Sequence, residues 1–167
     1  MQDGYGDMPA DAGAMREMLT VVGLVRVALA RRLDMSLLDL EIMEQLLLAP
    51  AGTELGPGEL GRRLGVTSAA ATQAVTRLHH AGHVERRPHP GDRRRLTLEA
   101  TPTGREHVMA ALGPMLDLVT TASADLTQTE RSTVTRHLQG QTRAYRAFLE
   151  HLAAEQEPGG RTGDDHG

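Results

Sequence analysis

The chain has 167 residues, no cysteine, and an aromatic content of only 2%. This length fits one domain with extended ends, and the absence of cysteine excludes disulfides, thiolate metal ligands and cysteine nucleophiles. With so few aromatic side chains, the core must consist of Leu, Val, Met and Ala, a composition that favours helices. No apolar run approaches the roughly 20 residues of a membrane-spanning helix, and no secretory signal is visible. We therefore expect a cytoplasmic protein.

The net charge of −4 conceals two regions of opposite sign, and all 18 cationic residues are arginines. Between Leu55 and Arg105, nine arginines outweigh four acidic residues and give a net charge of +5. The rest of the chain has nine arginines and eighteen acidic residues, a net charge of −9. A basic segment inside an acidic chain indicates an anionic partner, although a solvated charged loop would have the same composition.

Apolar periodicity predicts two helices before the basic segment. A single apolar stripe predicts the first, over residues 12–33. Ser36 and Asp39 resemble a capping box for the second, over residues 37–49, which is apolar on most sides and is expected at the centre of the fold. Residues 1–10 and 157–167 are rich in Gly, Pro and Asp and are expected to be disordered tails on one domain spanning 11–156.

Two short helices follow, joined at Gly65. Pro57 suits the first turn of a helix over residues 57–64, and Thr67 or Ser68 can cap a second helix that runs to about residue 81. This is the pattern of a helix-turn-helix, in which Gly61 is small enough to let the second helix cross closely. A helical wheel predicts an inner face made of Ala71, Ala74, Val75 and Leu78. The outer face consists of Ala69, Gln73, Thr76, Arg77 and His80.

The outer face carries side chains that suit DNA. Gln pairs bidentately with adenine, Ala packs on the thymine methyl group, and Arg serves guanine or phosphate. An ordinary helical hairpin with a polar outer face is the alternative. The next segment favours DNA, because short β-like stretches at 84–88 and 96–101 flank a Pro-Gly turn loaded with arginine. A loop-tip arginine fits a narrow minor groove, where Asp92 can hold a neighbouring guanidinium in position.

Two further helices are predicted after this hairpin. Thr101 and Pro102 open the first, over residues 102–122, and Thr127 with Glu130 forms a capping box for the second, over 128–154. The last helix carries an apolar stripe at Val134, Leu138, Tyr145, Phe148 and Leu152. Because apolar stripes on both end helices need a partner surface, we expect a homodimer held by these residues.

The segment from Leu55 to Val108 resembles the winged helix-turn-helix of the MarR family, the bacterial multiple-antibiotic-resistance-type regulators. The most specific part is Asp92-Arg93-Arg94 followed by Leu96, Leu98, Thr101 and Gly104, which matches the wing signature of that family in order and spacing. The flanking helices extend the resemblance to residues 12–154. It implies a mostly α-helical (α+β) fold with N- and C-terminal dimerisation helices, and a homodimeric regulator, expected to be a repressor, on a pseudo-palindromic DNA site.

The resemblance also implies site residues. The major-groove set is Thr67, Ser68, Ala69, Thr72, Gln73, Thr76 and Arg77. The wing set is Arg86, Asp92, Arg93, Arg94 and Arg95. Many members of the family bind small anions in a cleft between the dimerisation helices and the winged domain. Arg26 is then the candidate partner for such an effector.

Other functions fit the sequence less well. Gly56, Gly58 and Gly61 match G-x-G-x-x-G, but a dinucleotide enzyme needs a buried strand before the first glycine, and the sequence there is AGTEL. No catalytic pattern is seen, so no enzyme and no cofactor are expected. His79, His80 and His83 leave open a metal-responsive or protein-interaction winged-helix module with weak DNA binding.

Overall fold

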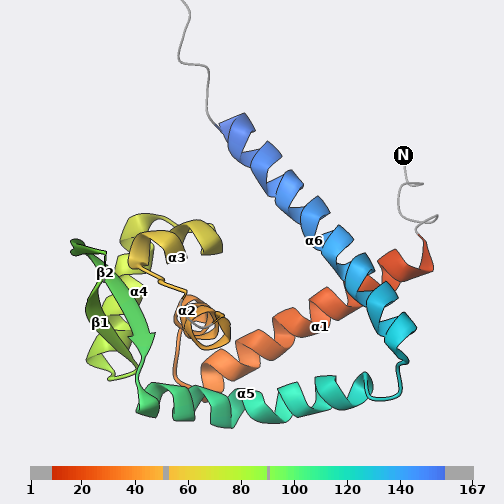
Figure 1. Ribbon diagram of the computed structural model, residues 1–167, viewed down its shortest axis with the longest axis horizontal. Coiled ribbons are helices and arrows are strands. Elements are labelled where there is room, and N and C mark those ends of the chain that lie inside the picture. The colour runs from red at the N-terminus through yellow and green to blue at the C-terminus, as the bar shows by residue number, and fades with distance from the viewer. Residues whose placement is uncertain (1–8, 51–52, 90, 157–167) are drawn as a thin grey trace, which may run out of the picture. The chain divides into compact units, whose positions relative to one another are not determined.

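The computed structural model describes residues 9–50, 53–89 and 91–156, without the side chains of Arg93, Arg94 and Gln156. Its elements, shown in Figure 1, are α1 (Ala10–Arg32), α2 (Leu37–Leu48), α3 (Pro57–Leu64), α4 (Ser68–His80), β1 (Val84–His89), β2 (Asp92–Ala100), α5 (Pro102–Ala122) and α6 (Gln128–Gln156). Contacts divide the chain into two compact units, Met1–Leu118 and Val119–Gly167, with α5 crossing the boundary. The mostly helical winged-helix fold predicted from the sequence is confirmed.

Helix α2 is the centre of the first unit. It begins with the predicted capping box, in which the Ser36 hydroxyl accepts the Asp39 N–H at 3.1 Å and the Asp39 carboxylate accepts the Ser36 N–H at 3.3 Å. Leu40, Ile42 and Met43 of α2 are fully buried. The helix contacts α1, α3, α4 and β2, and Figure 1 shows it between α1 and the two strands.

Helices α3 and α4 form the predicted helix-turn-helix. Gly65 ends α3 in the left-handed conformation, with φ of 66°, a value that a residue with a β-carbon seldom adopts. A β-carbon on Gly61 would lie 3.3 Å from the Val66 carbonyl oxygen and 3.5 Å from the Ala71 β-carbon, so the two helices approach as closely as predicted. The buried residues of α4 are Ala71, Ala74, Val75 and Leu78, as the helical wheel indicated.

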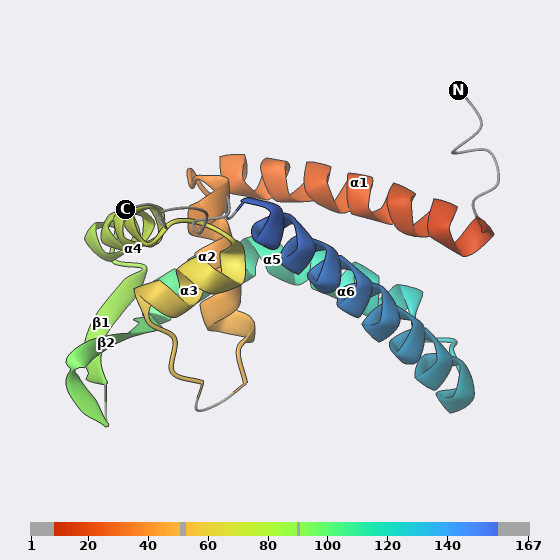
Figure 2. The same cartoon turned by 90° about the horizontal axis from the view of Figure 1, so that it is seen from above.

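Strands β1 and β2 form an antiparallel hairpin that leaves the helices as a wing (Figure 2). Their register pairs Val84 with Ala100 and Pro88 with Leu96, and it becomes irregular after Pro88. The Leu98 N–H donates to the Leu55 carbonyl at 2.8 Å, so the segment before α3 occupies part of the free edge of β2. Strand β2 begins four residues earlier than predicted, because an arginine run reads as a turn until its partner strand is known.

The start of α5 packs against the turn that follows α4. The Thr101 hydroxyl donates to the Gly82 carbonyl at 2.6 Å and accepts the Gly104 N–H at 2.9 Å. A β-carbon on Gly104 would lie 2.3 Å from the His83 carbonyl oxygen, closer than any real contact of this kind. Gly104 is therefore required for this packing, independently of its place in the wing signature.

The second unit consists of the end of α5 and the whole of α6. Thr127 and Glu130 form the predicted capping box, with N···O distances of 2.8 and 3.3 Å. The hydrogen bond from the Thr127 hydroxyl lowers the pKa of Glu130 below its usual range. Arg131 braces the preceding turn by donating to the carbonyls of Ala124 and Leu126. In neither unit is any described helix both long and apolar enough to cross a membrane.

Candidate nucleic-acid interface

The first two turns of α4 present an exposed polar surface. Thr67 is the N-cap of α4, and its hydroxyl accepts the Ala70 N–H at 3.2 Å. The next predicted contact residues, all exposed, are Ser68, Ala69, Thr72 and Gln73. The N-terminal residues of a recognition helix are the ones that reach base edges in the major groove. The opposite face of α4 is fully buried, and this fixes which side chains point outward.

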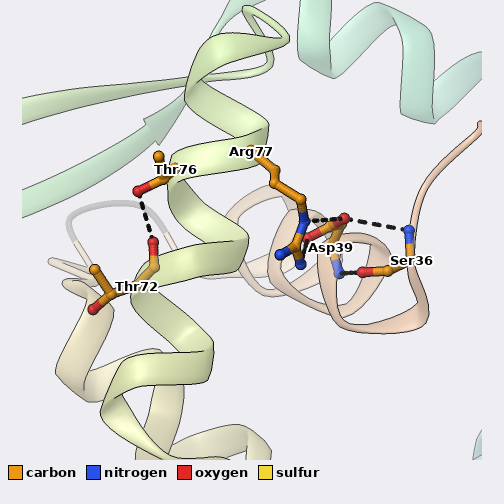
Figure 3. Close-up of polar contacts among 5 residues, drawn as sticks. All are labelled: Ser36, Asp39, Thr72, Thr76 and Arg77. Carbon is orange, nitrogen blue, oxygen red and sulfur yellow. Dashed lines mark hydrogen bonds and ion pairs between the residues drawn. The ribbon is translucent and has the colours of Figure 1, made fainter.

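Thr76 and Arg77 depart from this row, and Figure 3 shows that they leave α4 in different directions. Thr76 is half-buried, and its hydroxyl donates to the Thr72 carbonyl at 2.9 Å and accepts from Arg86 of β1 at 2.6 Å. Arg86, which was predicted as a wing contact, thus ties β1 to α4. Arg77 extends towards α2 and forms an ion pair with Asp39 at 2.8 Å.

The wing carries most of the remaining predicted contact residues. Arg95 and Asp92 are exposed on β2. The side chains of Arg93 and Arg94 lie outside the described residues. Arg87 lies between two carboxylates, with Glu85 at 3.2 Å and Glu99 at 3.0 Å, so part of the positive charge of the wing is neutralised within the hairpin.

The wing turn is organised by His89, a residue that the sequence pattern did not single out. Its Nδ1 atom accepts the N–H groups of Gly91 at 3.0 Å and Asp92 at 3.2 Å. An accepting ring nitrogen carries no proton, so the proton lies on Nε2, which faces the Glu54 carboxylate at 2.5 Å. The position of His89 directly before Pro-Gly was the one available signal, because short turns favour side chains that accept nearby N–H groups.

Helix α3 contributes arginines that are already paired. Arg62 and Arg63 both donate to Glu59, with Arg63 Nε at 2.8 Å. These hydrogen bonds, that from Arg62 first, lower the pKa of Glu59 from its usual 4.5 to about 2. The carboxylate therefore stays ionised far below neutral pH. The positive field of this region is smaller than the count of its arginines suggests.

Arg26 does not lie in an open anion site. Its guanidinium pairs with Glu41 at 3.3 Å and Glu44 at 2.5 Å, which joins α1 to α2. Two carboxylates already satisfy its charge, so these contacts do not support the effector role predicted for Arg26.

The residues of the predicted dimer stripe are largely exposed in their own unit. Val134 and Leu138 are 44% and 41% exposed, Tyr145 and Phe148 are 50% and 58% exposed, and Leu152 is half-buried. Helix α1 adds exposed apolar residues in its N-terminal two thirds, at Met18, Leu19, Val21, Val22 and Leu24.

The three histidines for which the sequence left a metal role open do not all lie on one element. His79 and His80 lie on the last turn of α4 with ring centroids 6.1 Å apart, whereas His83 follows Gly82 and meets His107 of α5 at 5.1 Å. Burial and the charge of His107 lower the pKa of His83. Among the described residues there is no group of three or more His, Asp or Glu side chains that could hold a metal ion.

The helix-turn-helix and its wing define the chain as a winged-helix protein, and comparison with known proteins shows which family this segment is similar to. Residues 33–95 match the sequence model of the MarR family. A curated relative, the uncharacterized HTH-type transcriptional regulator YcgE of Bacillus subtilis, is 31% identical over 80 residues. That match covers 46% of this chain and 52% of YcgE, so the chain spans about half the length of this relative.

Solved structures agree with the fold. A mutant MepR from a multidrug-resistant clinical isolate of S. aureus has a TM-score of 0.66 at 14% identity, with 82% of this chain and 98% of that chain covered. A second S. aureus MepR mutant, bound to an oligodeoxyribonucleotide, has a TM-score of 0.53 at 15% identity, with 83% and 99% covered. The predicted resemblance is confirmed for residues 33–95, which match the model of the MarR family.

Proposed function

We propose that this chain is a homodimeric transcriptional regulator that binds duplex DNA, with α4 in the major groove and the wing at the adjacent minor groove. The observation that carries the proposal is the set of exposed side chains on the outer face of α4. Gln73 is exposed and, among the described residues, makes no hydrogen bond through its side chain, while the inner face of the helix is fully buried. A side chain held on a rigid helix with its amide unpaired is suited to reading an adenine edge. The MepR structure with an oligodeoxyribonucleotide supports this mode by analogy of fold.

We further propose that α1 and α6 form the dimer interface. A helix of 29 residues with none of its described side chains buried has no core of its own to stabilise it. The apolar residues of α6 and the N-terminal part of α1 supply the missing hydrophobic contact when a second copy covers them. A symmetric dimer presents two recognition helices, which suits a pseudo-palindromic operator. Repression is the proposed mode, because it requires only occupancy of the operator.

We place a small-molecule effector in a cavity of about 590 Å³ between the end of α2, the segment before α3, and β2. This volume is in the range of pockets for drug-sized ligands. Its lining combines apolar Leu46, Leu47 and Leu55 with charged Glu54 and Arg105. Thermal-shift screening of phenolic acids should give shifts that Leu46→Trp abolishes by filling the space, and equal shifts in Leu46→Trp and wild type would exclude this site.

The test of DNA binding is selection from a random pool of duplexes at physiological salt. We expect an inverted repeat with half-sites about one helical turn apart, and affinity that falls steeply with salt. Failure to enrich any sequence, together with weak and salt-insensitive association, would favour the alternative of a protein-interaction module.

A further inference from the structure

The ion pair between Arg77 and Asp39 joins the recognition helix to the centre of the fold. Arg77 donates from Nη2 to Asp39 Oδ1 at 2.8 Å and from Nε to Oδ2 at 3.2 Å, so one edge of the guanidinium faces both carboxylate oxygens (Figure 3). The Asp39 side chain is 8% exposed and that of Arg77 is 52% exposed. The pair therefore has one buried member, fixed in α2, and one member that reaches the surface.

Asp39 is also held in place by hydrogen bonds to Ser36 at the start of α2. Its Oδ2 atom also accepts the Ser36 N–H, and its own N–H donates to the Ser36 hydroxyl at 3.1 Å. The carboxylate is thus held by the first turn of α2 before Arg77 approaches it. A bidentate pair with a fixed carboxylate sets the plane of the guanidinium as well as its position.

This geometry decides what Arg77 can offer to a ligand. The Nε–Nη2 edge of the guanidinium is occupied by Asp39, so only its Nη1–Nη2 end is left to contact a ligand. The remaining N–H groups belong to Nη1 and the outer side of Nη2, and about half of the side chain is exposed to meet a partner. Arg77 also lies in the third turn of α4, beyond the N-terminal residues that reach base edges.

We propose that Asp39 is a positioning residue for DNA binding, which holds Arg77 against α2 and directs its open edge to a backbone phosphate rather than to a base. This inference rests on the proposed DNA-binding function. Phosphate contacts fix the register of a protein on the duplex, while base contacts supply the sequence information. Asp39, which does not lie on the outer face of α4, would then control sequence specificity through the placement of that helix.

The test is the variant Asp39→Asn, because simple electrostatics and the proposed positioning role predict different effects on specific DNA binding. Removing a negative charge from a DNA-binding protein should strengthen its association with every duplex. We expect instead that the ratio of specific to non-specific affinity falls about tenfold, while non-specific affinity stays equal or rises. In an Arg77→Lys background, where the bidentate pair is already lost, Asp39→Asn should cause little further change.

Two control variants separate this role from structural effects. Ser36→Ala removes the hydroxyl that caps the same helix end but leaves the Asp39–Arg77 pair, so it should keep the specificity ratio. Glu41→Gln makes the same change of charge on α2, but Glu41 pairs with Arg26 of α1 and not with a residue of α4. This variant should also keep the specificity ratio.

The outcomes are distinguishable. Wild-type protein that selects no DNA sequence would overturn both the proposed function and this inference. Wild-type protein that selects a sequence, with Asp39→Asn retaining the ratio within about twofold, would overturn the inference alone. The inference would equally be overturned if Ser36→Ala lowered the ratio as far as Asp39→Asn does, because the effect would then belong to the helix cap.

Discussion

Single side chains on the outer face of α4 carry the base preference that we propose. Gln73→Ala should relax the preference at one base pair of each half-site, at a cost of about 1–3 kcal/mol for the preferred base. The physical reason is that the amide of Gln73 is exposed and satisfies no partner among the described residues. Competition binding with operators changed at single positions measures this effect.

Gln128→Ala is the matched control, because it removes the same amide from the exposed first turn of α6. It should leave the base preference unchanged. A uniform loss of affinity across all sequences with Gln73→Ala would show that this residue contacts the backbone and reads no base.

His83 makes folding stability depend on pH near neutrality. Burial first, and then the charge of His107, lower the pKa of His83 in the folded protein below its usual 6.5. The unfolded chain therefore binds the proton more readily, and the contribution is complete above pH 6.5 and is lost as the pH falls through the lowered folded pKa. Urea unfolding at pH 7.5 and 5.5 should give a smaller free energy at pH 5.5.

Replacing His83 with Gln should reduce that difference, because the amide does not titrate. An unchanged pH dependence in His83→Gln would assign the effect to other groups.

At the scale of elements, the wing depends on a turn that one side chain holds. His89→Ala removes the acceptor of two backbone N–H groups and the contact with Glu54. We expect faster hydrogen exchange of the Gly91 and Asp92 amides, by up to about tenfold for a net bond of 0.5–1.5 kcal/mol, and weaker operator binding.

The variant His89→Asn refines this prediction. Its side-chain oxygen can take the place of Nδ1 but does not reach Glu54, so it should restore protection of the amides without restoring the link to the segment before α3. Equal exchange in wild type, His89→Ala and His89→Asn would show that the turn forms without this side chain.

Element boundaries could be read from the sequence wherever a local signal marks them. Helix α3 was predicted at its observed limits, because the ring of Pro57 fixes a φ angle suited to the first turn and Gly65 readily adopts the left-handed conformation that ends a helix. The contacts between elements could not be predicted in the same way. Asp39 and Arg77 lie 38 residues apart in the sequence. The residues around Asp39 indicate only a helix cap, and those around Arg77 indicate only a DNA contact. Their ion pair could therefore not be predicted. For Arg26, nothing in the sequence indicated its ion pairs with Glu41 and Glu44.

At the scale of the whole molecule, the proposed function depends on a second copy. Phe148→Asp places a carboxylate on the apolar stripe of α6 and removes a contact worth about 2–3 kcal/mol per subunit. The variant should shift towards monomer and bind the operator more weakly, although no predicted DNA contact changes. Sedimentation at low micromolar concentration measures the shift.

Ala147→Asp introduces the same charge on the neighbouring position, which lies off the stripe, and should remain a dimer. A full dimer formed by Phe148→Asp under these conditions would refute the assignment of the interface to this stripe.

The contact of Gly104 with the His83 carbonyl has a consequence for genetics. No β-carbon fits at this position, so any substitution must separate α5 from the turn after the recognition helix and lower the melting temperature. A screen for lost regulation will therefore recover Gly104 alleles beside those of residues that touch DNA. The two classes will differ in growth conditions, because Gly104→Ala should give a temperature-sensitive regulator that is active at low temperature and depleted by proteolysis when warm. Under the proposed function, such an allele would provide a conditional switch for identifying the target genes.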